Sequence, residues 1–242
     1  MSNRERTNKL IIAILFVLLM GLLVNYAGIL FFDTDNYHGD MAEGDKDVLL
    51  CIIDESEPRL GMGACDMVFI IHLENGTFKN YSPVYPSGMV DPNKQEPIEA
   101  QNKGAGSSLL LHDAFWYDDD QSSMGNAKEI VEYNCNVSID GVIAINAEAL
   151  SAILKEAGPV TVGNKTFTPN SFDIIGDPYS GGNANVSMMD IVREVINNAK
   201  DPSVKSAMVQ EAFSQYSQGN IVMTPKGAFT TFLYMRGLET MN

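Results

Sequence analysis

The sequence predicts a layered α/β/α domain with a mixed central sheet, preceded by one N-terminal transmembrane helix. Two observations predict the domain. Continuous apolar runs of strand length occur, such as DVLLCIID at Asp47–Asp54, and further along the chain apolar strands alternate with amphipathic helices. A third observation predicts the membrane helix, because no residue from Leu10 to Phe32 carries a charge.

The uncharged segment at residues 10–32 is long enough to cross a bilayer. As a helix it reaches about 34 Å, and the hydrocarbon core of a membrane is about 30 Å thick. Basic residues precede the segment and aspartates follow it. The positive-inside rule therefore places residues 1–9 in the cytoplasm, as a basic tail, and the rest of the chain outside the cell membrane. The competing interpretation is a cleaved signal peptide, but Asn25-Tyr26-Ala27 fits a cleavage site poorly, so we favour a retained signal anchor.

The charge balance excludes one class of partner. The chain has 16 Lys+Arg and 31 Asp+Glu, a net charge of −15, and residues 1–32 contribute +2, so the remainder carries −17. A domain this acidic repels the phosphate backbone, and nucleic acid is not an expected partner. It also repels anionic lipid, so we expect contact with the bilayer through residues 10–32 alone. Residues 33–46 are polar and acidic and are predicted to form a linker.

The folded domain is predicted at residues 47–242. A second apolar strand covers Asp66–Leu73, Asn75-Gly76 forms a hairpin turn, and Phe78–Ser82 returns as a third strand. Residues 84–106 are rich in Pro, Gly, Asn and Gln and are predicted to be a long exposed excursion. A helix capped by Ser122 or Ser123 follows and runs to about residue 134.

The best-defined local unit is GVIAIN at Gly141–Asn146, followed by a helix over Ala147–Ala157 that Asn146 caps and Gly158-Pro159 ends. A strand at Val160–Val162 comes next, and Gly163-Asn164 turns it into another. The remaining predicted elements are helices at Ser187–Ala199, Pro202–Ser217 and Lys226–Gly237, and a short strand at Ile221–Met223.

Candidate ligand-binding residues gather at predicted strand ends. Asp54 closes the first strand and Asp66 opens the second, so antiparallel pairing would bring both carboxylates to one edge of the sheet, where they are able to hold Mg²⁺. The alternative is that both aspartates mark turns. His112 beside Asp113, in an aromatic setting, is a candidate for proton transfer or for a structural polar pair. Asp118-Asp119-Asp120 lacks the spacing of a calcium loop and is predicted to be an exposed acidic turn.

The remaining candidate residues are the cysteines and the asparagines of N-glycosylation sequons. The three cysteines match no metal-ligand spacing and are predicted to be small core residues, with one disulfide left open as an alternative. Common hydrolase and nucleotide-binding motifs are absent from the sequence. The cysteines are Cys51, Cys65 and Cys135, and the N-glycosylation candidates are Asn75, Asn80, Asn136, Asn164 and Asn185.

The order of elements resembles a known family. From Asp47 to Val162 the chain is similar to the extracytoplasmic domain of the LytR–CpsA–Psr family, in which an apolar strand ends in Asp and a second strand begins with Ser-Asp-Thr-Met. Here Asp54 and Ala64-Cys65-Asp66-Met67 stand at those places. A closer likeness, carried by DGVIAINAEALSAILKEAGPVTV and extending to about residue 235, is to a prokaryotic group known as the domain of unknown function numbered 4012.

The resemblance implies an activity, and the departures from it argue against that activity. LytR–CpsA–Psr proteins transfer glycopolymers from polyprenyl-pyrophosphate carriers with Mg²⁺, and they bind the pyrophosphate with several arginines. In this sequence only Arg59 and Arg193 remain as candidates, and Val84-Tyr85-Pro86-Ser87 replaces a Pro-Arg-Asp stretch. Each lost charge-assisted contact removes about 1.5–3 kcal/mol.

Three hypotheses of function follow. The first is a non-catalytic protein of the cell envelope that binds a glycopolymer, a lipid-linked glycan or a protein partner. The second is a glycopolymer phosphotransferase that uses Asp54, Asp66 and Mg²⁺. The third is a structural component of the envelope. The shortage of arginines favours the first over the second.

Overall fold

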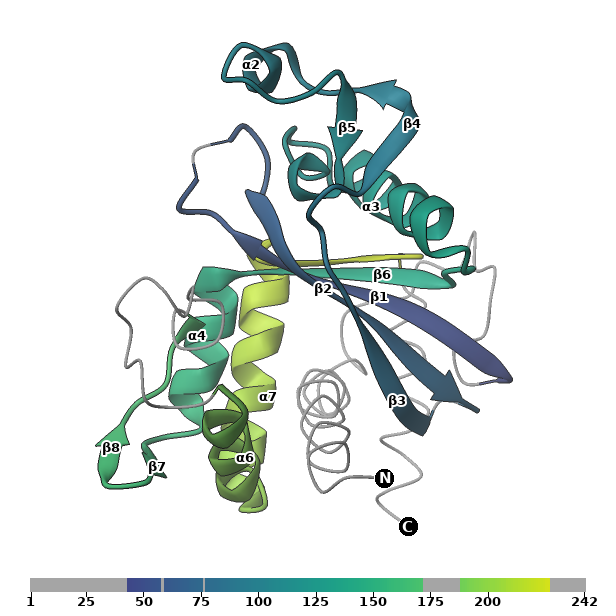
Figure 1. Cartoon of the computed structure of the whole chain (residues 1–242). Helices are drawn as coiled ribbons and strands as arrows, with labels where there is room; N and C mark the ends of the chain where they lie inside the picture. The colour runs from purple at the N-terminus through teal and green to yellow at the C-terminus, as the bar shows by residue number, and fades with distance from the viewer. Residues whose placement is uncertain (1–42, 58, 76, 172–187, 227–242) are drawn as a thin grey trace.

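Five strands form the central sheet of the computed structural model, which describes residues 43–57, 59–75, 77–171 and 188–226. The spatial order is β3-β2-β1-β6-β9 (Figure 1). β1 pairs in parallel with β6, and the other three neighbouring pairs are antiparallel, so the sheet is mixed, as predicted. The strands are β1 (Asp45–Asp54), β2 (Ala64–Glu74), β3 (Thr77–Val84), β6 (Gly141–Asn146) and β9 (Ile221–Thr224).

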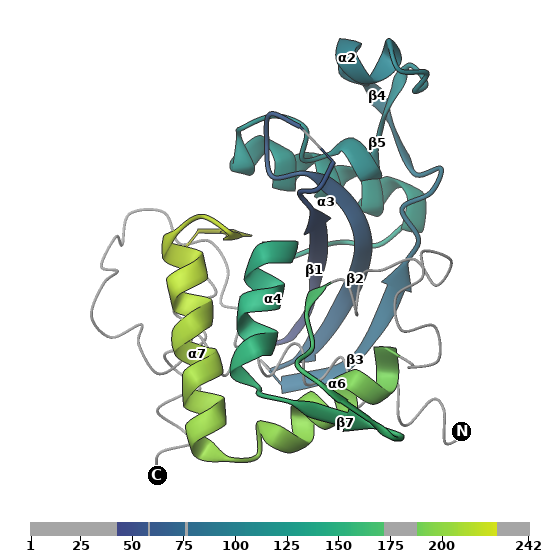
Figure 2. The same ribbon diagram turned by 90° about the vertical axis from the view of Figure 1, so that its left-hand side faces the viewer.

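Helices cover both faces of this sheet. α3 (Asp120–Cys135) lies on one face, and α4 (Ala147–Glu156), α6 (Met188–Asn198) and α7 (Pro202–Ser217) lie on the other (Figures 1 and 2). Side chains of a strand alternate between the faces, so β1 supplies both cores. Val48, Leu50 and Ile52 pack on the α4 side, and Leu49, Cys51 and Ile53 pack on the α3 side. The predicted three-layer domain is therefore confirmed.

Short-range signals in the sequence set several of these elements. The side chain of Asn146 accepts a hydrogen bond from the Ala149 N–H at 2.8 Å and caps α4, as predicted. The hairpin of β7 (Val160–Val162) and β8 (Lys165–Phe167) follows that helix. Asn75 adopts a φ of 48° in the turn between β2 and β3, which asparagine tolerates better than most residues.

Residues 84–106 form an excursion in which most residues are exposed, as predicted, but the prediction missed its regular structure. The segment contains β4 (Val90–Gln95) and a short helix α2 (Ile98–Gln101), and β5 (Ser108–Leu110), which follows, pairs antiparallel with β4. We call residues 90–110 the β4–β5 lobe; it stands above α3 at the top of Figure 1. The pattern of residues did not predict this lobe because both strands are short, β4 is mostly polar, and their pairing joins residues that are not neighbours in the sequence.

Two boundaries also differ from the predictions. β1 begins at Asp45, inside the predicted acidic linker. Asp119, and not Ser122 or Ser123, caps α3, because its carboxylate accepts a hydrogen bond from the Ser122 N–H at 3.1 Å. The acidic triplet at 118–120 therefore contains a helix cap, which is a common use of aspartate.

Several predictions lie outside the described residues: the membrane helix at 10–32, the linker as far as residue 42, Asn185, and the last helix from residue 227 onward. Within the described ranges, no helix combines the length and the apolar character needed to cross a bilayer. Cys51 and Cys65 are buried and Cys135 is partly buried, and all three are free thiols, as expected for core residues. A hydrogen bond of the Cys65 thiol with Cys51, together with burial, raises the pKa of the Cys65 thiol.

Candidate functional site

Asp54 and Asp66 lie at the same edge of the sheet, where β1 ends and β2 begins. The two strands are antiparallel neighbours, and Asp54 pairs with Ala64. Ile52 pairs with Met67 and Ile53 with Cys65, so Asp66 is the extra residue of a β-bulge. A bulge turns a side chain away from the direction that a regular strand would give it. This bulge brings Asp66 within reach of His112 from another part of the chain.

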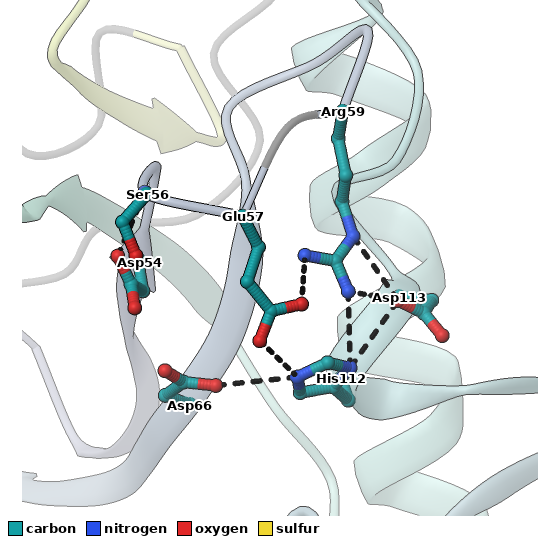
Figure 3. A network of polar contacts seen from close by, with 7 residues as sticks. All are labelled: Asp54, Ser56, Glu57, Arg59, Asp66, His112 and Asp113. Carbon is teal, nitrogen blue, oxygen red and sulfur yellow. Dashed lines mark hydrogen bonds and ion pairs between the residues drawn. The ribbon is translucent and has the colours of Figure 1, made fainter. Parts of the chain in front are cut away.

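A chain of charged side chains runs inward from Asp66 (Figure 3). The Asp66 Oδ1 atom lies 3.3 Å from His112 Nε2, and His112 Nδ1 lies 3.2 Å from Asp113 Oδ1. Arg59 Nε donates to the same Asp113 oxygen at 3.1 Å, and Arg59 Nη2 also donates to it. His112 and Asp113 belong to a 3-10 turn at Leu111–Asp113, immediately after β5. The structure thus joins four of the five predicted ligand-binding residues in one network.

Arg59 has no free face toward solvent. Its side chain is only 4% exposed, Nη1 donates to Glu57 Oε2 at 3.1 Å, and Cζ lies 5.1 Å from the centre of the Trp116 ring. The loop that carries Arg59 is held down by Gly61, whose N–H donates to the Trp116 carbonyl at 2.7 Å. A side chain at Gly61 would collide with the carbonyls of Phe115 and Tyr117. The guanidinium is therefore fixed between two carboxylates and an aromatic ring.

His112 acts as a fixed cation in this network. Its hydrogen bonds to Asp113 and Asp66 raise the pKa of His112 to about 10, although burial and the nearby Arg59 charge act in the opposite direction. Burial raises the pKa of Asp113, but hydrogen bonds from His112, Glu96 and Arg59 outweigh it and hold the pKa of this carboxyl well below its usual range. At neutral pH this geometry gives an imidazolium, which is a poor general base. The structural alternative for His112 fits better than proton transfer.

Besides Glu57, two further glutamates that the sequence analysis missed belong to this region. Glu55 follows β1 and accepts hydrogen bonds from the N–H groups of Ala147 at 2.7 Å and Glu148 at 2.6 Å. It therefore occupies the N-terminal end of α4, which otherwise attracts anions. Glu96 of the β4–β5 lobe is 2% exposed. The position of Glu55 directly after a strand was a usable signal, whereas nothing in the local sequence marks Glu96 as buried.

The magnesium prediction rests on Asp54 and Asp66 alone. Asp54 Oδ1 accepts a hydrogen bond from the Ser56 N–H at 2.8 Å, and Asp66 faces His112, so each carboxylate already has a partner of its own. Over the ranges that the structure describes, no group of three or more His, Cys, Asp or Glu side chains is arranged to hold a metal ion. A site for Mg²⁺ at this edge, completed by water or substrate oxygens, stays a prediction.

The other two candidate features are separate from the network. Arg193 lies on α6, where its Nη1 donates to Asp190 at 2.7 Å. Among the sequons, Asn75 lies in the β2–β3 turn and its Oδ1 accepts from the Gly44 N–H at 3.0 Å, while Asn136 ends α3 with a φ of 52°. Asn80 lies on β3 and Asn164 in the β7–β8 turn. Glycan attachment at any of these positions stays a prediction.

The fold and the network define a mixed-sheet α/β/α domain with an acidic, internally paired cluster at one sheet edge. A family model described as "Protein of unknown function (DUF4012)" matches residues 43–177, more than half of the chain. The chain belongs to this family, which confirms the closer of the two predicted resemblances. No curated relative matches the sequence.

Solved structures of similar fold include proteins of the other predicted family, LytR–CpsA–Psr. Bacillus subtilis TagV is 13% identical with a TM-score of 0.44, covering 80% of this chain and 80% of TagV. B. subtilis TagU is 13% identical with a TM-score of 0.42, covering 80% and 81%. The protein gbs0355 from Streptococcus agalactiae is 13% identical with a TM-score of 0.47, covering 81% and 75%. At these values the likeness carries no argument about activity.

Proposed function

We propose that this chain is a membrane-anchored, extracytoplasmic binding protein of the cell envelope, without transferase activity. Its ligand would be an envelope glycopolymer or a protein, and not a pyrophosphate-linked carrier. The anchor is the uncharged segment at residues 10–32, with basic residues before it and an acidic domain after it. The carboxylates of Asp66 and Glu57, which are partly exposed, are suited to accept hydrogen bonds from sugar hydroxyls or from amide groups.

One observation carries the proposal: the cations of the site are already neutralised by the chain itself. Arg59 is bound by Asp113 and Glu57, and His112 by Asp113 and Asp66. Two cations thus face three carboxylates, before Asp54 and Glu55 at the same edge are counted. A pyrophosphate needs several free charge-assisted donors, and breaking the buried Arg59 pair to supply one would cost several kcal/mol.

The N-terminal end of α4 supports the same conclusion. A helix N-terminus at the carboxyl end of parallel strands is the usual place for a phosphate group in α/β folds. β1 and β6 are parallel, and α4 follows β6 directly. Glu55 and Asn146 already accept the hydrogen bonds of the Ala147, Glu148 and Ala149 N–H groups. A phosphate would therefore have to displace a carboxylate of the chain.

Calorimetry on the full-length protein in detergent micelles tests the proposal. We expect no saturable heat on titration with a polyprenyl pyrophosphate in the presence of Mg²⁺, and saturable binding of soluble envelope-polymer fragments. Carrier binding that requires Mg²⁺ and is lost in Asp54→Ala and Asp66→Ala, but kept in the matched control Asp190→Ala on α6, would establish the transferase alternative. Absence of binding heat with either ligand would favour a structural envelope component.

The proposed location has its own test. Protease added outside intact spheroplasts should digest the acidic domain and leave a fragment containing residues 10–32 in the membrane. A full-length chain that is protected from the protease, or found free of the membrane fraction, would overturn the location without bearing on the site.

A further inference from the structure

Glu96 links the end of β4 to the β5 side of the β4–β5 lobe. It follows β4 directly, its N–H donates to the Ser107 carbonyl at 3.0 Å, and its Oε2 accepts from the Leu110 N–H at 2.8 Å. The backbone and the side chain of Glu96 thus both bind the β5 side of the lobe. With 2% exposure, Glu96 is among the most deeply buried charged residues of the described chain.

The second oxygen of this carboxyl, Oε1, has no hydrogen-bond donor among the described residues, although it is fully buried. Asp113, whose side chain is 6% exposed, is a hydrogen-bonding neighbour of this carboxyl group. Two carboxyl groups form such a bond only when one of them holds a proton. A proton on Oε1 would make Glu96 the donor of this bond and would explain why this buried oxygen has no donor of its own.

The surroundings decide which of the two holds the proton. Arg59 and His112 both face Asp113 and stabilise its negative charge. No cation is paired with Glu96 among the described salt bridges, and Leu110 supplies only a neutral N–H. Burial and the contact with Asp113 raise the pKa of Glu96 to about 8, while the Leu110 N–H and the His112 charge act in the opposite direction.

We propose that the Glu96–Asp113 pair is a proton-dependent contact that holds the β4–β5 lobe against the Arg59–His112 network, and that loss of the proton releases this side of the lobe. Ionised Glu96 would place two carboxylates in contact inside a water-poor site, which is strongly unfavourable. The proton that Glu96 loses is accepted by water or buffer, and no other covalent bond changes. The inference concerns the conformation of the site and does not depend on which ligand the protein binds.

The other contacts of the lobe determine how it can move. Lys94 of β4 donates to Asn126 on α3 at 2.8 Å and also contacts Glu129 on α3. Asn134 of α3 donates to the Val90 carbonyl at 2.9 Å. The start of β4 therefore stays attached to α3. The end that carries Glu96 and Lys103 is the end that moves.

Trp116 reports this movement directly. It is the single tryptophan of the chain, it is 7% exposed, and its ring lies 5.9 Å from Lys103 Nζ of the lobe and 5.1 Å from Arg59 Cζ. The backbone N–H of Trp116 donates to the Asp113 carbonyl at 3.1 Å. Movement of the Glu96 end of the lobe would remove Lys103 from the ring and admit water.

The test is a titration of Trp116 fluorescence in the full-length protein in detergent micelles, between about pH 6 and pH 9. As the pH rises, we expect the Trp116 emission to shift to the red and to be quenched more strongly by acrylamide. The midpoint of this transition should lie near pH 8. Glu96→Gln keeps a donor toward Asp113 and removes the ionisable group, so its spectrum should not change over this range. The matched control Glu129→Gln, on α3 beside Lys94, should keep the wild-type transition.

Two results would overturn the proposal: a wild-type spectrum that does not change with pH, or a transition that persists in Glu96→Gln. If Glu96→Gln does not fold, infrared spectroscopy of the wild-type protein decides the question. The carbonyl stretch of a protonated carboxyl should be present at pH 6 and disappear with the same midpoint as the fluorescence change. Its absence at pH 6 would show that Glu96 is ionised and would refute the inference.

Discussion

The face of the sheet covered by α4, α6 and α7 and the face covered by α3 and the β4–β5 lobe bury different chemistry. On the first, the buried side chains of the described residues are apolar or uncharged, such as Leu150, Leu154 and Gln215. On the second, Asp91, Glu96 and Asp113 are buried as well. One sheet thus separates a core that depends on packing from a polar network that depends on protonation.

The largest effect is expected on the polar side. Asp113→Ala leaves the Arg59 guanidinium buried without its main partner, and loss of one member of a buried pair typically costs about 3–5 kcal/mol. Urea unfolding followed by circular dichroism measures the loss. The exposed pair of Arg193 and Asp190 is the matched control: Asp190→Ala should change the free energy of unfolding by no more than about 1 kcal/mol. Equal losses in the two variants would contradict the distinction between buried and exposed pairs.

On the apolar side, Leu154→Ala should cost about 2–5 kcal/mol, because it opens a cavity between α4 and the sheet at a residue that is 1% exposed. No group on this face changes its charge with the substitution. The loss should therefore have the same size at pH 6 and pH 9 in thermal or urea unfolding. A loss that varies strongly with pH would show that the two faces are coupled more closely than the packing suggests.

The pH dependence of stability should come from the polar side. Because the pKa of His112 is raised to about 10, the folded chain keeps a proton that the unfolded chain releases above its ordinary pKa of 6.5. Its contribution is full below pH 6.5 and is lost as the pH rises toward 10. A third of the side chain is exposed, so solvent screening limits the expected loss to roughly 1–2 kcal/mol.

His112→Gln should flatten the fall in unfolding free energy between pH 6.5 and 10, measured by urea unfolding at intervals across this range. Glu96→Gln should flatten a different part of the pH profile of the unfolding free energy, from about pH 4.5 to 8. The reason is that Glu96 also keeps a proton in the folded chain that the unfolded chain releases. Identical profiles in the wild type and both variants would place the pH dependence elsewhere in the protein.

The smallest effect is expected at the end of α4. Glu55→Ala removes the acceptor of two N–H groups and a negative charge near the positive end of the helix dipole, at a cost of about 1 kcal/mol. Glu156, at the opposite end of the same helix, provides the control, because Glu156→Ala removes an unfavourably placed charge and should not destabilise. A larger loss in Glu156→Ala than in Glu55→Ala would contradict the assigned role of Glu55.

Local pattern predicted the apolar side of the molecule well. The run from Gly141 to Val162 has strand and helix periodicities, an asparagine cap and a Gly-Pro stop, and all of these act between neighbours in sequence. The common edge of Asp54 and Asp66 was predicted on the condition that the first two strands are antiparallel neighbours, and β1 and β2 meet this condition.

The polar network could be predicted only in part. Arg59, His112 and Asp113 were recognised as candidates, but their contact joins residues more than 50 positions apart, and no local signal gives such a distance. The burial of Glu96 was missed because the surrounding residues are polar and rich in proline, asparagine and glycine, a composition typical of exposed loops. The partner that makes its burial tolerable, Asp113, lies in a separate segment of the chain.

Arg59 is bound by its own carboxylates, Glu57 and Asp113, and on our proposal it is not free for a phosphate. A double-mutant cycle with Arg59→Met and Asp113→Ala, on the full-length protein at neutral pH, measures this most directly. We predict that the two substitutions together cost less than the sum of the single losses by at least about 2 kcal/mol, as for contacting buried charges. Additive losses, with a coupling energy near zero, would contradict the account and leave Arg59 available to a ligand.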